Sequence, residues 1–83
     1  MPYNRLLAAK KRAVGTKQTT KAVSKGLARV VYIARDAETR VTGPLVELCR
    51  QQGVEIIEVN SMKELGKACG IEVGSASAAI LEE

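Results

Sequence analysis

The stretch VGTKQTTKAVSKG, residues 14–26, combines a glycine with a regular row of ammonium groups. Gly15 stands where a helix would begin, and Lys17, Lys21 and Lys25 recur every four residues along it. The first turn of a helix leaves backbone amides free and carries a partial positive charge, so a phosphate group is a natural ligand there. Residues four apart share one helical face, so the lysines would form a stripe beside that end. This pattern favours binding of a phosphate-bearing polyanion.

The side chains within this stretch are also suited to the edges of nucleic-acid bases. Gln18 and Lys21 are three apart and would lie on one face of the helix. An ammonium group donates to guanine O6 and N7 or to phosphate, and an amide both donates and accepts. The hydroxyl of Thr16 can cap the helix or donate to a ligand. A solvated helix face is the alternative, and for a lysine stripe alone it would be preferred.

Charge is distributed unevenly along the 83 residues, whose net charge is +4. Nine Lys or Arg and no Asp or Glu lie in residues 1–35, and all nine carboxylates follow from Asp36 onward. A surface of one sign on a folded domain attracts polyanions. A merely solvated surface is the alternative, but no acid interrupts the basic run, which favours the polyanion.

Few residues are suited to catalysis or to metal binding. The chain has no His, and its two cysteines, Cys49 and Cys69, fit no zinc spacing and predict buried, reduced thiols. The Gly66-Lys67 pair lacks the rest of a P-loop pattern. We therefore expect no metal, no cofactor, no small-molecule substrate and no enzymatic activity. A small enzyme or phosphate carrier that uses the helix end at Gly15 is the less favoured alternative.

The sequence GIEVG, residues 70–74, is a second candidate for ligand contact. Ile71 and Val73 flank Glu72, and such alternation is typical of a strand. From the residues alone, a core position is therefore favoured for Val73. A loop with apolar tips would instead offer a dry surface to an unstacked RNA base.

Hydrophobic periodicity and glycine terminators predict alternating helices and strands. Helices are expected over Tyr3–Val14, from Thr16 as N-cap to about Lys25, from Pro44 to about Gln52 and over Met62–Ala68, and strands over Arg29–Ala34, Glu55–Val59 and Val73–Leu81. A short strand near Val14 is compatible with this order. The pattern predicts an α/β fold, a three-layer α/β/α sandwich with a small mixed sheet of about four strands.

Residues 1–83 are expected to form a single domain, because the chain is too short for two. No apolar run approaches the length of a membrane span, and no signal peptide is visible. We expect a cytoplasmic protein, a monomer, that does not bind membranes.

Two motifs together resemble a known family. The sequence GTKQTTKA, with its later glycine and the strand VVYIARDA, resembles the N-terminal signature of the L-seven-Ae family of ribosomal proteins. LGKACGIEVGSASAAI is similar to that family's second signature. The resemblance spans almost the whole chain and is strongest to the short bacterial, YbxF-type branch. It implies an α/β/α sandwich that binds kink-turn RNA, a duplex sharply bent at a three-nucleotide bulge beside tandem sheared G·A pairs.

The resemblance also implies which residues contact the RNA. In the family, the start of the helix after the glycine enters the opened groove at the G·A pairs, an element that here comprises Gly15, Thr16, Lys17, Gln18 and Lys21. A loop contacts the flipped-out bulge nucleotide, and the matching residues are Ile71, Glu72 and Val73. Glu38 matches a further family position near that nucleotide.

This chain departs from the family at Lys17-Gln18, where archaeal and eukaryotic members usually have Asn-Glu. Lys17 gains charge for phosphate, and Gln18 keeps part of the acceptor role of Glu without its charge-assisted strength. Recognition of G·A pairs should persist, with more dependence on salt. The sequence thus predicts a non-enzymatic protein that binds a kink-turn in ribosomal RNA or another structured RNA. A ribosomal structural protein with basic, shape-blind RNA contacts is the alternative.

Overall fold

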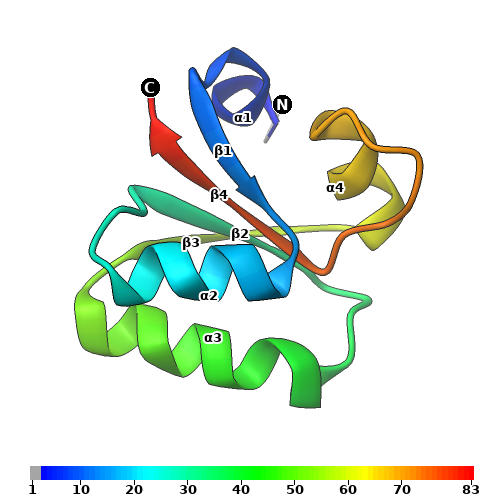
Figure 1. Ribbon diagram of the computed structural model, residues 1–83. Coiled ribbons are helices and arrows are strands. Elements are labelled where there is room, and N and C mark those ends of the chain that lie inside the picture. The colour runs from blue at the N-terminus through cyan, green and yellow to red at the C-terminus, as the bar shows by residue number, and fades with distance from the viewer. Residues whose placement is uncertain (1–2) are drawn as a thin grey trace.

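The computed structural model describes residues 3–83, in which short helices alternate with short strands (Figure 1). The elements are α1 (Asn4–Ala8), β1 (Lys11–Val14), α2 (Thr16–Ser24), β2 (Val30–Ala34), α3 (Thr39–Gln52), β3 (Glu55–Val59), α4 (Met62–Ala68) and β4 (Ser77–Glu82). No helix among residues 3–83 is long and apolar enough to cross a membrane.

The strands form one mixed sheet in the order β1-β4-β2-β3. β4 pairs antiparallel with both β1 and β2, whereas β2 and β3 are parallel. All five residues of β2 are buried, as expected for a central strand covered on both faces. Their side chains alternate between the two faces, with Val30 and Tyr32 on one and Val31 and Ile33 on the other.

Helices cover both faces of this sheet, so the fold is the expected three-layer sandwich. Leu6 of α1 and Leu65 of α4 pack on the face that contains Tyr32. Val23 of α2 and Leu45 of α3 pack on the opposite face. Figure 1 shows the two helix pairs on either side of the sheet. The core is made of aliphatic residues and two tyrosines because the sequence has neither Phe nor Trp.

The predicted helix over Tyr3–Val14 is confirmed only in its first part, because the chain leaves α1 at Ala8 and enters the edge strand β1. The backbone N–H of Lys10 donates to Glu82 O at 2.8 Å, which starts the pairing with β4. Ala13 and Val14 then point to opposite faces of the sheet, so the short strand that the sequence allowed near Val14 is present. Leu7 of α1 is 56% exposed.

Three further boundaries differ from the sequence prediction. Gly15 rather than Thr16 is the N-cap of α2, and Thr16 is its first helical residue. α3 begins at Thr39, before Pro44, because Glu38 O already accepts the N–H groups of Val41 and Thr42 at 2.9 and 3.2 Å. β4 begins only at Ser77, and the residues from 70 to 76 form a loop.

Other expectations are confirmed. β3 and α4 have the predicted bounds, and Ser61 Oγ accepts the backbone N–H of Glu64 at 3.1 Å, as an N-cap should. Cys49 and Cys69 are free and buried, and burial raises the pKa of both thiols. Both cysteines therefore contribute to packing as small apolar side chains.

Candidate nucleic-acid interface

The two elements singled out in the sequence meet at one end of the sheet. β1 leads into the first turn of α2 at the end where β4 begins (Figure 1). The backbone N–H of Gly15 donates to Ser77 O at 2.9 Å, and the hydroxyls of Thr16 and Ser77 are 2.9 Å apart. Ser77 directly follows the loop of residues 70–76, called here the α4–β4 loop. The start of α2 and this loop are therefore neighbours in space, although about 60 residues separate them in sequence.

The start of α2, residues 15–18, offers unpaired backbone donors at residues 16–18, whereas the N–H of Gly15 donates to Ser77 O. Gly15 has a φ of 92° and a ψ of 154°, a backbone conformation that residues other than glycine rarely adopt. It provides no side-chain cap, and the first N–H groups of a helix have no partner within the helix. The side chains of Lys17 and Gln18 are exposed beside these amides. An anion placed here would meet free N–H groups, the helix dipole and an ammonium group.

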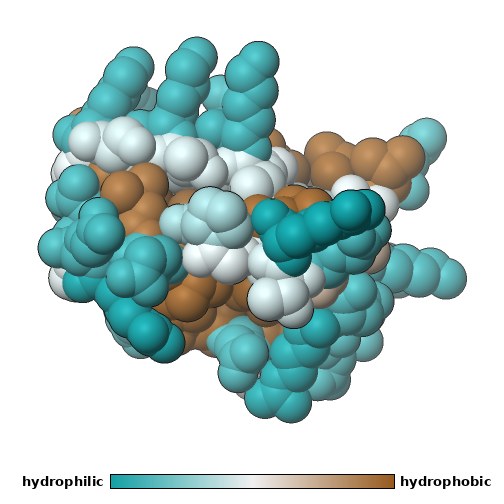
Figure 2. All heavy atoms as spheres, turned by 90° about the horizontal axis from the view of Figure 1, so that it is seen from below, coloured by the Kyte–Doolittle hydropathy of each residue, from teal (hydrophilic) through white to brown (hydrophobic). Residues whose placement is uncertain are grey.

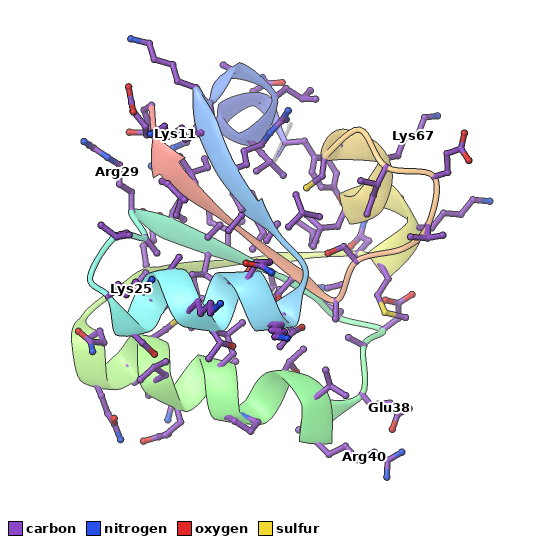
Figure 3. All side chains as sticks on the ribbon, viewed as in Figure 1. Lys11, Lys25, Arg29, Glu38, Arg40 and Lys67 are labelled. Carbon is purple, nitrogen blue, oxygen red and sulfur yellow. The ribbon has the colours of Figure 1, made fainter. Side chains whose placement is uncertain are left out.

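The lysine row along α2 adds charge that no neighbouring carboxylate neutralises. Lys17, Lys21 and Lys25 are all exposed. Every ion pair within residues 3–83 is formed by an arginine, so no ion pair offsets the positive charges of the lysines in this part of the chain. Long hydrophilic side chains stand out along one border of the face in Figure 2. In Figure 3, Lys25 lies at the end of α2 away from the α4–β4 loop.

A groove of about 380 Å³ runs between this face of α2 and the edge strand β1. Gln18, Lys21 and Lys25 line its α2 side, and Leu27 and Leu81 contribute apolar surface. Gln18 belongs to the first turn of α2, so one end of the groove lies close to the free amides. A chain of phosphates could follow the lysines from there along the helix.

The α4–β4 loop supplies an apolar tip. Val73 is 71% exposed, the highest value among the large exposed hydrophobic side chains of residues 3–83. Glu72 beside it is exposed, and Ile71 is half-buried. The favoured sequence interpretation, a strand with Val73 in the core, is therefore wrong. The exposure agrees with the loop that the family resemblance implied.

Hydrogen bonds and close contacts hold this exposed tip in place. The N–H of Ile71 donates to Gly66 O and that of Ser75 to Met62 O, both at 3.0 Å, so α4 holds the loop near its two ends. Val73 O lies against the backbone of Gly66, where a Cβ would overlap it. The absence of a side chain at residue 66 is thus what lets the loop lie on the helix.

Sequence reasoning missed several residues that position the site. Gly66 was considered only as part of a phosphate motif, although a glycine inside a helix was an available signal for close packing. Asp36 was also missed, and its Oδ1 accepts the N–H of Met62 at 2.8 Å, which ties the end of β2 to the start of α4. Ser75 and Ser77 are buried serines whose roles no local pattern indicates.

Glu38 lies apart from the joined elements. It is the N-cap of α3, and its carboxylate accepts from Arg40 Nε at 2.7 Å on an exposed surface. Figure 3 shows both side chains pointing outward. Within residues 3–83, no hydrogen bond connects Glu38 to α2 or to the α4–β4 loop. Eight of the nine predicted contact residues thus belong to two adjoining elements, and Glu38 belongs to a third, the start of α3.

The arrangement is suited to binding an anionic ligand. It combines free amides, uncompensated ammonium groups, an amide side chain and an apolar tip. No group of three or more His, Cys, Asp or Glu within residues 3–83 is placed to hold a metal ion. The site's chemistry matches a polyanion that also presents an apolar or aromatic surface.

The fold and the site define a small α/β/α domain with a cationic helix end beside an apolar loop. The sequence model of the Ribosomal protein L7Ae/L30e/S12e/Gadd45 family matches residues 3–83, and the chain belongs to this family.

Relatives and a solved structure are similar over nearly the whole chain. An "RNA-binding protein" of Bacillus pumilus is 43% identical over 81 residues, which cover 98% of this chain and 99% of the relative. "RNA-binding protein YbxF" of Geobacillus stearothermophilus is 42% identical over the same shares of both chains. The structure of the Giardia lamblia 15.5kD RNA binding protein superimposes with a TM-score of 0.82 at 29% identity, covering 99% of this chain and 68% of that one.

Proposed function

We propose that this chain is a non-enzymatic RNA-binding protein that recognises and stabilises kink-turns in structured RNA. The observation that carries the proposal is the contact between the start of α2 and the α4–β4 loop through Ser77. A kink-turn presents an opened groove and an extruded base close together, so it could touch both elements at once. The family and the RNA-binding relatives support RNA as that ligand.

The start of α2 would read the G·A pairs. The free amides of Thr16 and Lys17 and the ammonium group of Lys17 are suited to phosphate oxygens. Gln18 and Lys21 project from the same side of the helix into the groove beside β1, where they are suited to guanine edges. Lys25 lies one turn further along this groove, where it adds charge toward the RNA backbone.

The α4–β4 loop would hold the bulge nucleotide. An unstacked base has an apolar face, and recognition of RNA irregularities uses such extruded bases. Val73 offers an exposed apolar surface, and the carbonyl contact at Gly66 keeps it at a fixed height above α4. Ile71 and Glu72 would complete the contact from the same loop, and Glu38 would approach the base from the start of α3.

Binding would select the bent conformer of the RNA. A preformed protein surface with two contact elements fits a sharply folded duplex and not an extended one, so complex formation shifts the population toward the bend. The phosphate contacts should weaken as salt rises, because counterions released on binding favour association less at high salt. Residues 1–83 would act as a single domain and as a cytoplasmic monomer, with ribosomal RNA among the candidate targets.

The proposal is tested by titrating the protein with two RNAs at fixed salt. One is a kink-turn duplex, and the other is the same duplex with its G·A pairs replaced by Watson–Crick pairs. A shape-specific binder should bind the second much more weakly. Equal affinity for both would show a shape-blind basic protein and would overturn the proposal.

A further inference from the structure

Ser77 is the point at which the two proposed contact elements are joined. Its carbonyl oxygen accepts two hydrogen bonds, from the N–H of Gly15 at 2.9 Å and from the hydroxyl of Ser75 at 2.6 Å. Its own hydroxyl is 2.9 Å from that of Thr16. One residue therefore contacts the first turn of α2 and the last part of the α4–β4 loop at the same time.

Both serine side chains are buried, so their hydroxyls need hydrogen-bond partners within the protein. Ser77 is fully buried and Ser75 is 4% exposed. The next residues of β4, Ala78 and Ala79, are also fully buried, so an alanine would suit this part of the strand. A buried hydroxyl costs free energy unless it is hydrogen-bonded, and both serine hydroxyls here have partners.

The other hydrogen bonds of the loop go elsewhere. Ile71 and Ser75 donate to α4, and Ala76 O accepts from Ala34 of β2. These bonds hold the loop on α4 and on the sheet whether or not Ser77 has a side chain. Within residues 3–83, the hydrogen bonds that connect the start of α2 to the segment 70–77 all end on Ser77.

We propose that Ser77 is a positioning residue that couples the two halves of the site. It would fix the distance between the start of α2 and the α4–β4 loop, so that contact with the G·A pairs places the loop correctly for the bulge base. This inference rests on the proposed function. It adds that the two RNA features are recognised cooperatively, and that the cooperativity depends on a hydroxyl that touches no RNA.

The coupling is measurable as a ratio of two affinities. The probes are a kink-turn RNA with an intact bulge and the same RNA with the contacted bulge nucleotide made abasic. The dissociation constant for the abasic RNA, divided by that for the intact RNA, gives the contribution of the base. The bend and the G·A pairs are the same in both RNAs. A change that only destabilises the fold or weakens the α2 contacts affects both RNAs equally and leaves the ratio unchanged.

Two variants test the assignment of the hydroxyl pair. Ser77→Ala and Thr16→Val each remove one hydroxyl of the pair. We expect both to lower the ratio about 3- to 10-fold, the effect of one lost hydrogen bond. Ser24→Ala, at an exposed position at the far end of α2, is the matched control and should keep the wild-type ratio.

Each outcome decides the inference. It is overturned if Ser77→Ala and Thr16→Val weaken both RNAs equally, or if the wild-type protein does not distinguish the abasic RNA. Thermal unfolding checks whether Ser77→Ala folds. If it does not, the affinity ratio of Thr16→Val decides the inference, because Thr16 is only half-buried. Failure of the proposed function is seen separately, as equal binding of the kink-turn and the duplex with Watson–Crick pairs.

Discussion

The start of α2 and the α4–β4 loop illustrate two ways in which a sequence encodes the proposed binding surface. The first is polar, and its properties follow from local chemistry: a glycine at positive φ, free amides and lysines four apart. The second is apolar, and its exposure depends on distant contacts with Gly66, Met62 and β2. The properties of the helix end follow mainly from its own residues, whereas the loop depends on the contacts that hold it on α4.

The largest effect is expected from Gly66→Ala, which places a methyl group where the loop packs on α4. The new Cβ would overlap Val73 O and lie 3.1 Å from Gly74 Cα, and both neighbours are backbone that cannot rotate away. Overpacking of this kind should lower the free energy of unfolding by about 3 kcal/mol, measured by urea denaturation.

A second glycine provides the control for this experiment. A Cβ at Gly43 in α3 meets nothing closer than 4.0 Å, so Gly43→Ala should change the free energy of unfolding by less than about 1 kcal/mol. An unchanged urea midpoint for Gly66→Ala would show that the loop does not need its close contact with α4.

Lys21→Ala tests the polar half of the comparison. The side chain is exposed and in no ion pair within residues 3–83, so the fold should keep its stability. Loss of a side chain that contacts a base should weaken binding of the kink-turn by about 1–3 kcal/mol. Fluorescence or filter-binding titration against the kink-turn and the Watson–Crick duplex measures this loss.

The matched control for Lys21 is Lys10→Ala. The backbone N–H of Lys10 donates to Glu82 O at the opposite end of β4 from Ser77. Lys10 therefore lies away from the proposed interface. Its loss should have a small effect that disappears as salt rises. If Lys21→Ala weakens both RNAs by the same factor, Lys21 acts as general charge and does not read a base.

Val73→Ala separates the loop's function from its stability. Because Val73 is 71% exposed, its truncation should change the free energy of unfolding by less than about 0.5 kcal/mol. Binding of the kink-turn should weaken by about 1.5 kcal/mol if the side chain is buried against the bulge base.

Val41→Ala is a matched truncation of another exposed valine, in α3. It should leave both stability and RNA affinity as they are. Equal affinities of Val73→Ala and the wild-type protein would show that the Val73 side chain does not pack against the bulge base.

The sequence predicted the layers of the fold and the polar site because both depend on short-range patterns. The apolar run from Val30 to Ala34 indicates a central strand, and the glycines at residues 15 and 26 bracket α2. The errors lie where pairing partners decide the structure. β1 forms because the segment after α1 meets the outer edge of β4, and no periodicity within the segment shows this.

The loop was the harder case for the same reason. Alternation of Ile71, Glu72 and Val73 fits a strand, but the strand begins later because Ser75 donates its N–H to α4 rather than to a neighbouring strand. The resemblance to a family indicated a loop where the local pattern did not. Its support by Gly66 and its junction at Ser77 required the three-dimensional structure.

The smallest effect concerns α1, which supports α4 and hence the loop from the other side. The Tyr3 hydroxyl donates to Glu64 Oε1 at 3.0 Å, and burial together with this bond raises the pKa of Tyr3 to about 12. The folded state thus favours the neutral phenol, so the free energy of unfolding is unaffected below pH 10 and decreases between pH 10 and 12, by about 1 kcal/mol at pH 11. The measurement is the difference between the wild-type protein and Tyr3→Phe in urea denaturation at pH 8 and pH 11, which separates the Tyr3 phenol from other effects of pH. Tyr3→Phe should be less stable than the wild-type protein at pH 8 and should lose less on going to pH 11; parallel losses in the two proteins would show that the phenol of Tyr3 is not held by α4.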